Sequence, residues 1–281
     1  MGRPDYDENR PDGWKRPDRI TDSLTGFKLG ISGFLHSGRQ QSGRQLSLAL
    51  IFLVVLAIAA LVGSCSNDEE SGPTTPGDPS PGARLLALGN SYTVGHAVPE
   101  GCSWPHQLAD SLAVAGDSLE VLEVIAKTGW TSAALRDTVA RHPFDAPYDL
   151  VMLQIGVNDQ FTSRPRHLFT ADLAALIDTA LVLAAGDTGR VICLSIPDYG
   201  VTPVGQMLGA DRISEDISRF NLAAEAVAVS RGVTYLDITD LSREAEHDRD
   251  LVARDGIHCS TEMYRRWVSR MLPAVRAVLS R

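Results

Sequence analysis

The chain has 281 residues, 44% of them hydrophobic and 22% charged, so it can bury one large core or two small ones. The formal net charge is −9; residues 1–65 carry 8 Lys/Arg and 6 Asp/Glu, so the other 216 residues carry −11. An acidic body argues against a nucleic-acid partner, and the absence of a phosphate-binding glycine loop, a His-Glu-x-x-His pair and a Cys-x-x-Cys pair disfavours nucleotide and zinc chemistry.

The N-terminal part of the chain has the composition of an export segment behind a polar extension. Residues 1–45 are rich in Arg, Asp, Gly and Pro, which predicts disorder or upstream sequence that is not translated in the cell. Residues 46–65 begin with an 18-residue run whose only polar side chain is Ser47, as in a secretory signal or a marginal membrane span. The run ends Leu-Val-Gly-Ser-Cys, which resembles a bacterial lipobox with Cys65 as the lipidated residue. A transmembrane anchor is the alternative. Either kind of segment would export the C-terminal part of the chain to the cell envelope.

Residues 66–83 are rich in Pro, Gly, Ser and Thr and predict a flexible tether, so the folded domain is expected to span residues 84–281. Helical spacing marks residues 173–181 and 263–275, and Pro273 is expected to kink the second helix. Five apolar runs alternate with helical patterns, at Arg84–Leu88, Leu119–Ile125, Leu150–Ile155, Val191–Ile196 and Val233–Ile238. Such alternation predicts an α/β fold with helices on both faces of a parallel sheet, a three-layer α/β/α sandwich.

Four short blocks follow strands of the predicted sheet or precede the last helix. They are Gly89-Asn90-Ser91-Tyr92, Thr128-Gly129-Trp130-Thr131, Gly156-Val157-Asn158-Asp159 and Asp255-Gly256-Ile257-His258. Parallel α/β sheets place their sites at the carboxyl ends of the strands, so we expect the blocks to meet there. The first block alone fits an ordinary strand-to-helix turn with a capping serine equally well.

Together the blocks supply what acyl transfer needs, namely a nucleophile, a base and donors for an oxyanion. Ser91 offers the hydroxyl, and His258 can take its proton. Asp255, three residues earlier, can fix the tautomer of the imidazole. The backbone N–H groups of Ser91 and Gly129 and the side-chain amide of Asn158 are the candidate oxyanion hole.

At these blocks the chain resembles the SGNH (GDSL) hydrolase superfamily, from about Leu85 to the C-terminus. The resemblance implies a flavodoxin-like sheet of five parallel strands and hydrolysis of an ester through a Ser-His-Asp triad, with no metal and no cofactor. Lipid, lysophospholipid, thioester and acetylated carbohydrate all fit as substrates. The Gly-Asp-Ser-Leu of the family reads Gly-Asn-Ser-Tyr here. Because Asn90 can still hydrogen-bond locally, we expect activity to be retained, and we expect Asp159 to order its loop.

Other functions and other histidines remain open at this point. A non-catalytic envelope protein that binds a glycan or a partner, or an acyltransferase to a sugar hydroxyl, would use the same cleft. We expect a monomer. Glu244 and His247 form a second carboxylate–imidazole pair, but they lie in a charged stretch that predicts a solvated face. His96 and His106 flank the nucleophile helix and are interpreted as surface or helix-end histidines that could line the cleft.

The body contains three cysteines. Cys193 lies in an apolar strand and is expected in the core. Cys102 follows the Ser91 turn and Cys259 follows His258, so both are expected at the same end of the sheet. Export permits a disulfide between them, which is the prediction, with two free buried thiols as the equally weighted alternative.

Overall fold

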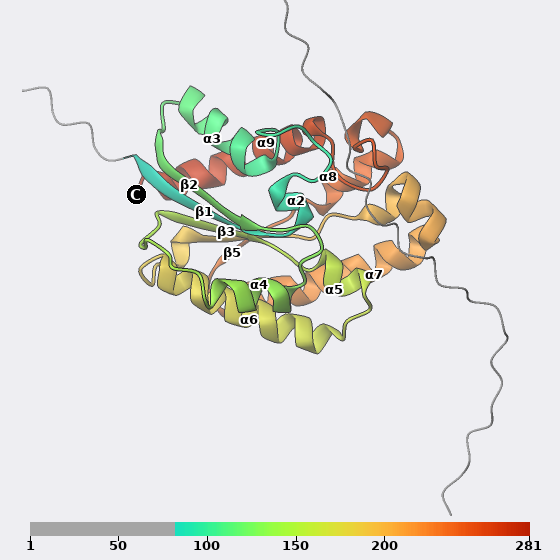
Figure 1. The fold of residues 1–281 in the computed structure, drawn as a ribbon, viewed down its shortest axis with the longest axis horizontal. Helices are drawn as coiled ribbons and strands as arrows, with labels where there is room; N and C mark the ends of the chain where they lie inside the picture. Colours follow the sequence, from blue (N-terminus) through green and yellow to red (C-terminus); the bar gives the residue numbers. More distant parts are fainter. Residues whose placement is uncertain (1–81) are drawn as a thin grey trace, which may run out of the picture. The chain divides into compact units, whose positions relative to one another are not determined.

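A parallel sheet of five strands forms the centre of residues 82–281, the part of the chain that the computed structural model describes (Figure 1). The strands are β1 (Ala83–Gly89), β2 (Leu119–Ala126), β3 (Leu150–Gln154), β4 (Val191–Leu194) and β5 (Thr234–Leu236). They lie in the order β2-β1-β3-β4-β5, and every neighbouring pair is parallel. This is the flavodoxin-like order, whose ligand sites lie at the carboxyl edge beside β1 and β3. The predicted fold class is confirmed.

Helices cover both faces of the sheet (Figure 1). One layer contains α3 (Trp104–Val114) and α9 (Thr261–Leu279), and the other contains α4 (Ser132–Val139), α6 (Arg166–Leu183) and α7 (Pro203–Ser230). The remaining elements are the short helices α2 (Ser91–Val94), α5 (Val157–Phe161) and α8 (Thr239–Arg243) and the 3₁₀ turns Thr188–Arg190, Tyr199–Val201, Glu244–Glu246 and Arg249–Leu251. Two of these short helices, α2 and α5, begin at the carboxyl ends of β1 and β3.

The central strands are buried on both faces, which explains why their sequences are continuously apolar rather than alternating. Every residue of β3 and β4 is buried, as are residues 85–89 of β1. In α9 the buried residues recur at helical spacing, and Trp267 has no exposed surface. The apolar face of α9 thus anchors the end of the chain immediately after the loop that contains Asp255 and His258.

Some details of the predicted elements differ in the structure, and β4 ends at Leu194, two residues before the end of the predicted run. β5 ends at Leu236, two residues early, because Asp237 accepts hydrogen bonds from Ser195 Oγ and the Thr239 N–H and turns the chain into α8. α9 continues through Pro273 as one helix, held by the buried residues on either side of it. The long α7, which has no counterpart in the sequence analysis, contains a left-handed residue at Gly209 (φ 104°).

The predicted N-terminal segments lie outside the described residues. This applies to the extension 1–45, the signal or anchor 46–65 with Cys65, and the tether as far as residue 81. None of the helices within residues 82–281 combines the length and hydrophobicity that a bilayer-crossing helix needs.

Candidate active site

Ser91 is the first residue of α2, at the carboxyl end of β1. Gly89 ends the strand without a left-handed backbone, so a glycine is needed here because neighbouring atoms approach closely. A Cβ at this position would lie 2.0 Å from Thr93 Oγ1 and 2.7 Å from the Gln154 carbonyl oxygen. Asn90 caps the helix because its Oδ1 accepts the N–H of Tyr92 at 3.0 Å. This local order fixes Ser91 at the edge of the sheet with 3% of its surface exposed.

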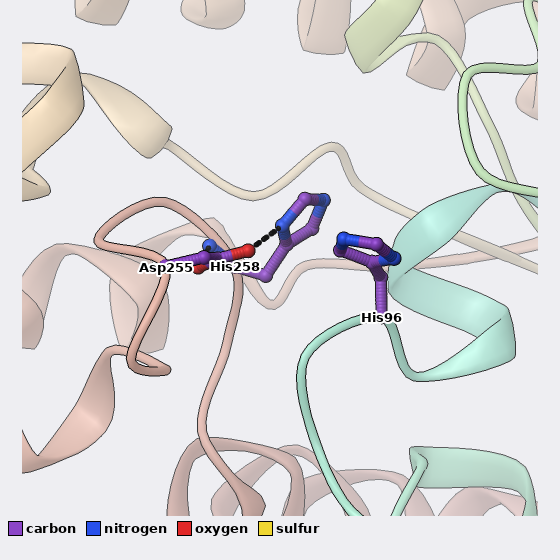
Figure 2. A group of neighbouring side chains, drawn as sticks. All are labelled: His96, Asp255 and His258. Atoms are coloured by element: carbon purple, nitrogen blue, oxygen red, sulfur yellow. Dashed lines mark hydrogen bonds and ion pairs between the residues drawn. The ribbon is translucent and has the colours of Figure 1, made fainter. Parts of the chain in front are cut away.

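The loop before α9 holds Asp255 and His258 as a bonded pair. One carboxylate oxygen of Asp255 accepts the backbone N–H groups of Ile257 and His258 at 3.1 and 3.0 Å, and the other lies 2.6 Å from His258 Nδ1 (Figure 2). A carboxylate at this distance assigns the hydrogen to Nδ1 and leaves Nε2 as the acceptor nitrogen of the neutral ring. This is the arrangement of a general base.

The same contacts set the protonation states of the pair. Burial alone would raise the pKa of Asp255, but hydrogen bonds from the His258 N–H, the His258 ring and the Ile257 N–H outweigh it, so the pKa is lowered. Burial lowers the pKa of His258 and outweighs the opposing hydrogen bond and charge of Asp255. At neutral pH the pair therefore consists of a carboxylate and a neutral imidazole, with a free lone pair on Nε2.

Tyr92 joins the helix that carries Ser91 to the His258 loop. Its ring centroid lies 5.1 Å from that of His258 and 6.3 Å from that of Trp267, and its hydroxyl donates to the Ile257 carbonyl oxygen at 3.4 Å. Ser91 and His258 both lie in the described part of the chain, and no hydrogen bond joins the Ser91 hydroxyl to the imidazole. Such bonds are often long without substrate and shorten only in the complex. The sequence analysis did not foresee this role of Tyr92, because a tyrosine beside a turn gives no signal of its partner.

Gly129 and Asn158 lie at the ends of the two strands that flank β1. Gly129 has a φ of 85°, which favours glycine although the space around it is open. The side-chain amide of Asn158 donates to the Trp130 carbonyl oxygen at 2.9 Å, which holds the two blocks together. Within residues 82–281, the backbone N–H groups of Ser91 and Gly129 have no hydrogen-bond acceptor. Both donors are therefore available to a ligand, as the predicted oxyanion hole requires.

A buried carboxylate, Asp159, ties these blocks to the helix that follows them. Asp159 has no exposed surface and accepts the Ser132 N–H at 2.8 Å, the Ser132 hydroxyl at 2.7 Å and Arg164 Nη1 at 3.0 Å. These bonds join Asp159 to the first residue of α4 and to the loop after α5, and none of them involves Asp255 or His258. The carboxylate therefore orders the loops around it. This agrees with the role expected for Asp159.

The predicted disulfide between Cys102 and Cys259 is wrong, because both thiols are free in the structure. The two loops do meet, but a glutamine joins them: Gln107 Nε2 donates to the Cys102 carbonyl oxygen at 2.8 Å and to the Thr261 carbonyl oxygen at 3.0 Å. Cys259 instead turns inward, is 6% exposed and lines a small cavity with Tyr92. Burial raises the pKa of its thiol, which makes it an unreactive core group.

The other histidines considered in the sequence analysis differ in their partners and their exposure. Glu244 pairs with Arg266 and not with His247, whose side chain is 84% exposed. His106 bonds to the Ser103 hydroxyl at 2.8 Å on the surface of α3. His96, in contrast, has its ring centroid 4.7 Å from that of His258 and therefore lies beside the candidate base. The sequence analysis weighted it toward a surface histidine, since its distance from His258 in the chain hides the contact.

Comparisons with known proteins identify the family of the chain. The model of the GDSL-like Lipase/Acylhydrolase family matches residues 87–266. An arylesterase of Vibrio mimicus is 31% identical over 123 residues, which cover 42% of this chain and 58% of that protein, so the chain spans little more than half of that relative.

Solved structures share the fold. The crystal structure of TesA is 20% identical with a TM-score of 0.54, over 69% of this chain and 99% of TesA. The psychrotrophic esterase EstA from Pseudoalteromonas sp. is 16% identical with a TM-score of 0.52, over 71% and 100%.

Proposed function

Because the chain belongs to the GDSL-like lipase/acylhydrolase family, a family of carboxylic ester hydrolases, we propose that it is a serine esterase in which Ser91, His258 and Asp255 form the triad. The observation that supports this most is the 2.6 Å contact between Asp255 and His258 Nδ1, in a loop joined through Tyr92 to the helix that begins with Ser91. Acyl transfer requires a base whose outer nitrogen is free to accept the proton of the nucleophile, and the Asp255 contact leaves His258 Nε2 in that state.

In the proposed mechanism the Ser91 oxygen attacks the ester carbonyl while His258 Nε2 takes the hydroxyl proton. The negative charge that develops on the carbonyl oxygen is stabilised by the N–H groups of Ser91 and Gly129 and by the amide of Asn158. His258 then passes its proton to the departing alkoxide, which leaves an acyl-serine. Water, deprotonated by the same imidazole, hydrolyses this ester, and the proton returns to Ser91. Asp255 keeps the ring oriented and stabilises its charged form.

A panel of p-nitrophenyl esters of increasing acyl length, with and without sugar acceptors, tests this function. We expect release of p-nitrophenol with free carboxylic acid as the other product, because water is the proposed acceptor. The chain-length preference then distinguishes a lipid or lysophospholipid acyl group from the acetyl group of a carbohydrate ester. Acylated sugar as the main product would identify an acyltransferase. No turnover of any ester, with binding of glycans intact, would identify the non-catalytic alternative.

We further propose that the enzyme is an envelope lipoprotein, tethered through residues 66–83 to a lipid on Cys65. This rests on the apolar run of residues 46–63, which ends in Gly63 and is followed by Ser64-Cys65, and on a first strand that begins at Ala83, where the predicted tether ends. Cells that express the chain should incorporate labelled palmitate into it, and Cys65→Ser should abolish the label. A mature protein that retains residues 46–63 would instead favour the transmembrane anchor.

A further inference from the structure

A second histidine faces the outer side of His258. His96, Asp255 and His258 form a cluster in which one potential metal-binding atom of each residue lies within 4.8 Å of those of the other two. Figure 2 shows the His258 ring between the Asp255 carboxylate and the His96 ring. The proposed esterase mechanism uses Asp255 and His258 but gives His96 no task, so this cluster contains one more ligand than the reaction needs.

The fold places His96 here by ending α2 after a single turn. The N–H groups of Gly95 and His96 both donate to the Ser91 carbonyl oxygen, at 3.1 and 2.9 Å, and Gly95 is left-handed with a φ of 78°. A Cβ on Gly95 would lie 2.5 Å from the Cβ of Ser103, so the turn is tight and specific. His96 is thereby held one helical turn from the candidate nucleophile while its ring remains exposed.

The hydrogen bonds of the two rings leave the same nitrogen free on each. Within residues 82–281, His258 Nδ1 is bonded to Asp255 and His96 Nδ1 lies 3.2 Å from the Thr128 hydroxyl, while neither Nε2 has a hydrogen-bond partner. When His96 donates its Nδ1–H to the Thr128 oxygen, the lone pair of its Nε2 is available to a metal ion. Two imidazole nitrogens on one tetrahedral zinc ion, with Zn–N bonds of about 2.0–2.1 Å, lie roughly 3.4 Å apart. The potential metal-binding atoms of the cluster lie within 4.8 Å of one another, and His96 is exposed, so its ring is free to turn toward this spacing. The Asp255–His258 contact also matches the carboxylate–histidine pair that orients zinc-binding imidazoles.

We propose that His96 and His258 bind a divalent transition-metal ion, with Zn²⁺ as the matching ion, and that the bound ion reversibly inhibits the enzyme. Asp255 orients His258 from behind, and water fills the remaining metal positions. The ion occupies the lone pair of Nε2, so His258 can no longer accept the Ser91 proton. Binding of the ion is independent of the proposed esterase function, whereas its inhibitory effect rests on that function.

Calorimetric titration with ZnCl₂ tests the site without reference to activity. The full chain, free of an affinity tag, carries Ser91→Ala in every sample, so that no turnover contributes heat. We expect His96→Ala and His258→Ala each to weaken one zinc-binding event by at least about tenfold. His247→Ala, which removes an exposed histidine outside the cluster, should leave the affinity unchanged and is the matched control. Equal zinc affinity in the His96→Ala and His247→Ala proteins would overturn the site.

Inhibition is then measured in proteins that retain Ser91. The rate of each variant with zinc is compared with the rate of the same variant without metal. Zinc should inhibit the wild type and the His247→Ala variant, and EDTA should restore the rate. His96→Ala should raise the half-inhibitory zinc concentration by the same factor by which it weakens binding. Zinc that binds through His96 without slowing ester hydrolysis would overturn the inhibitory role. If no ester is hydrolysed at all, the proposed function fails while the calorimetric result still decides the site.

Discussion

Ser91→Ala is expected to lower kcat/KM for ester hydrolysis by about 10⁴-fold or more while leaving the fold intact. The loss is large because the acyl-enzyme cannot form without the hydroxyl, and removal of a triad nucleophile eliminates most of the rate enhancement. The stability should barely change, since the Ser91 hydroxyl has no hydrogen-bond partner among residues 82–281 and only one oxygen atom is removed. We expect a change of less than about 1 kcal/mol in the free energy of unfolding. Hydrolysis of p-nitrophenyl acetate and a thermal melt measure the two effects.

Ser269→Ala is the matched control, because it removes a hydroxyl from the exposed side of α9, where Ser269 donates only to the Arg265 carbonyl oxygen. Its activity and melting temperature should equal those of the wild type. If Ser91→Ala retains activity comparable to the control, Ser91 is not the nucleophile. If activity and melting temperature fall together, the result reports unfolding, and mass spectrometry after incubation with a fluorophosphonate then tests directly whether Ser91 is the residue that is covalently labelled.

The architecture and the approximate position of the site could be predicted from the sequence because both depend on local patterns. Apolar runs of strand length located β1, β3 and β4, and parallel strands bring the residues that follow them to one edge. The contact between Asp255 and His258 spans only three residues, so its proximity follows from the chain itself. For Ser91, Gly129 and Asn158 the patterns indicated the correct edge of the sheet.

Contacts between loops that are distant in the sequence could not be predicted in the same way. Position along the chain indicates which edge of the sheet a residue occupies, but it gives neither the direction of a side chain nor a distance of a few ångströms. The predicted disulfide failed for this reason: Cys102 and Cys259 belong to loops that meet, yet Gln107 makes the connection and Cys259 points into the core. The approach of His96 to His258 was missed for the same reason.

His258→Ala should reduce kcat/KM about as much as Ser91→Ala, and the double variant should be no worse than either single one. Members of one catalytic unit are strongly non-additive, because removal of either disables the same proton transfer. His247→Ala should retain wild-type activity, since its ring is 84% exposed and its nearest carboxylate, on Glu246, lies 4.0 Å away. Full activity in the His258→Ala protein together with a loss in the His247→Ala protein would transfer the role of the base to His247.

The pH profile of kcat/KM shows whether His258 acts as the base or only supports the loop. The base must be neutral, so activity is present above the pKa of His258 in the free enzyme and falls as the pH drops through it. Burial lowers that pKa from its ordinary value of 6.5, so the acid limb should lie below pH 6.5. Asp255→Asn removes the charge that opposes this shift and replaces a charge-assisted hydrogen bond with a neutral one, so it should move the limb further down while cutting kcat by about 10⁴-fold. An acid limb well above pH 6.5, unchanged in Asp255→Asn, would show that another group titrates and that His258 is not the base.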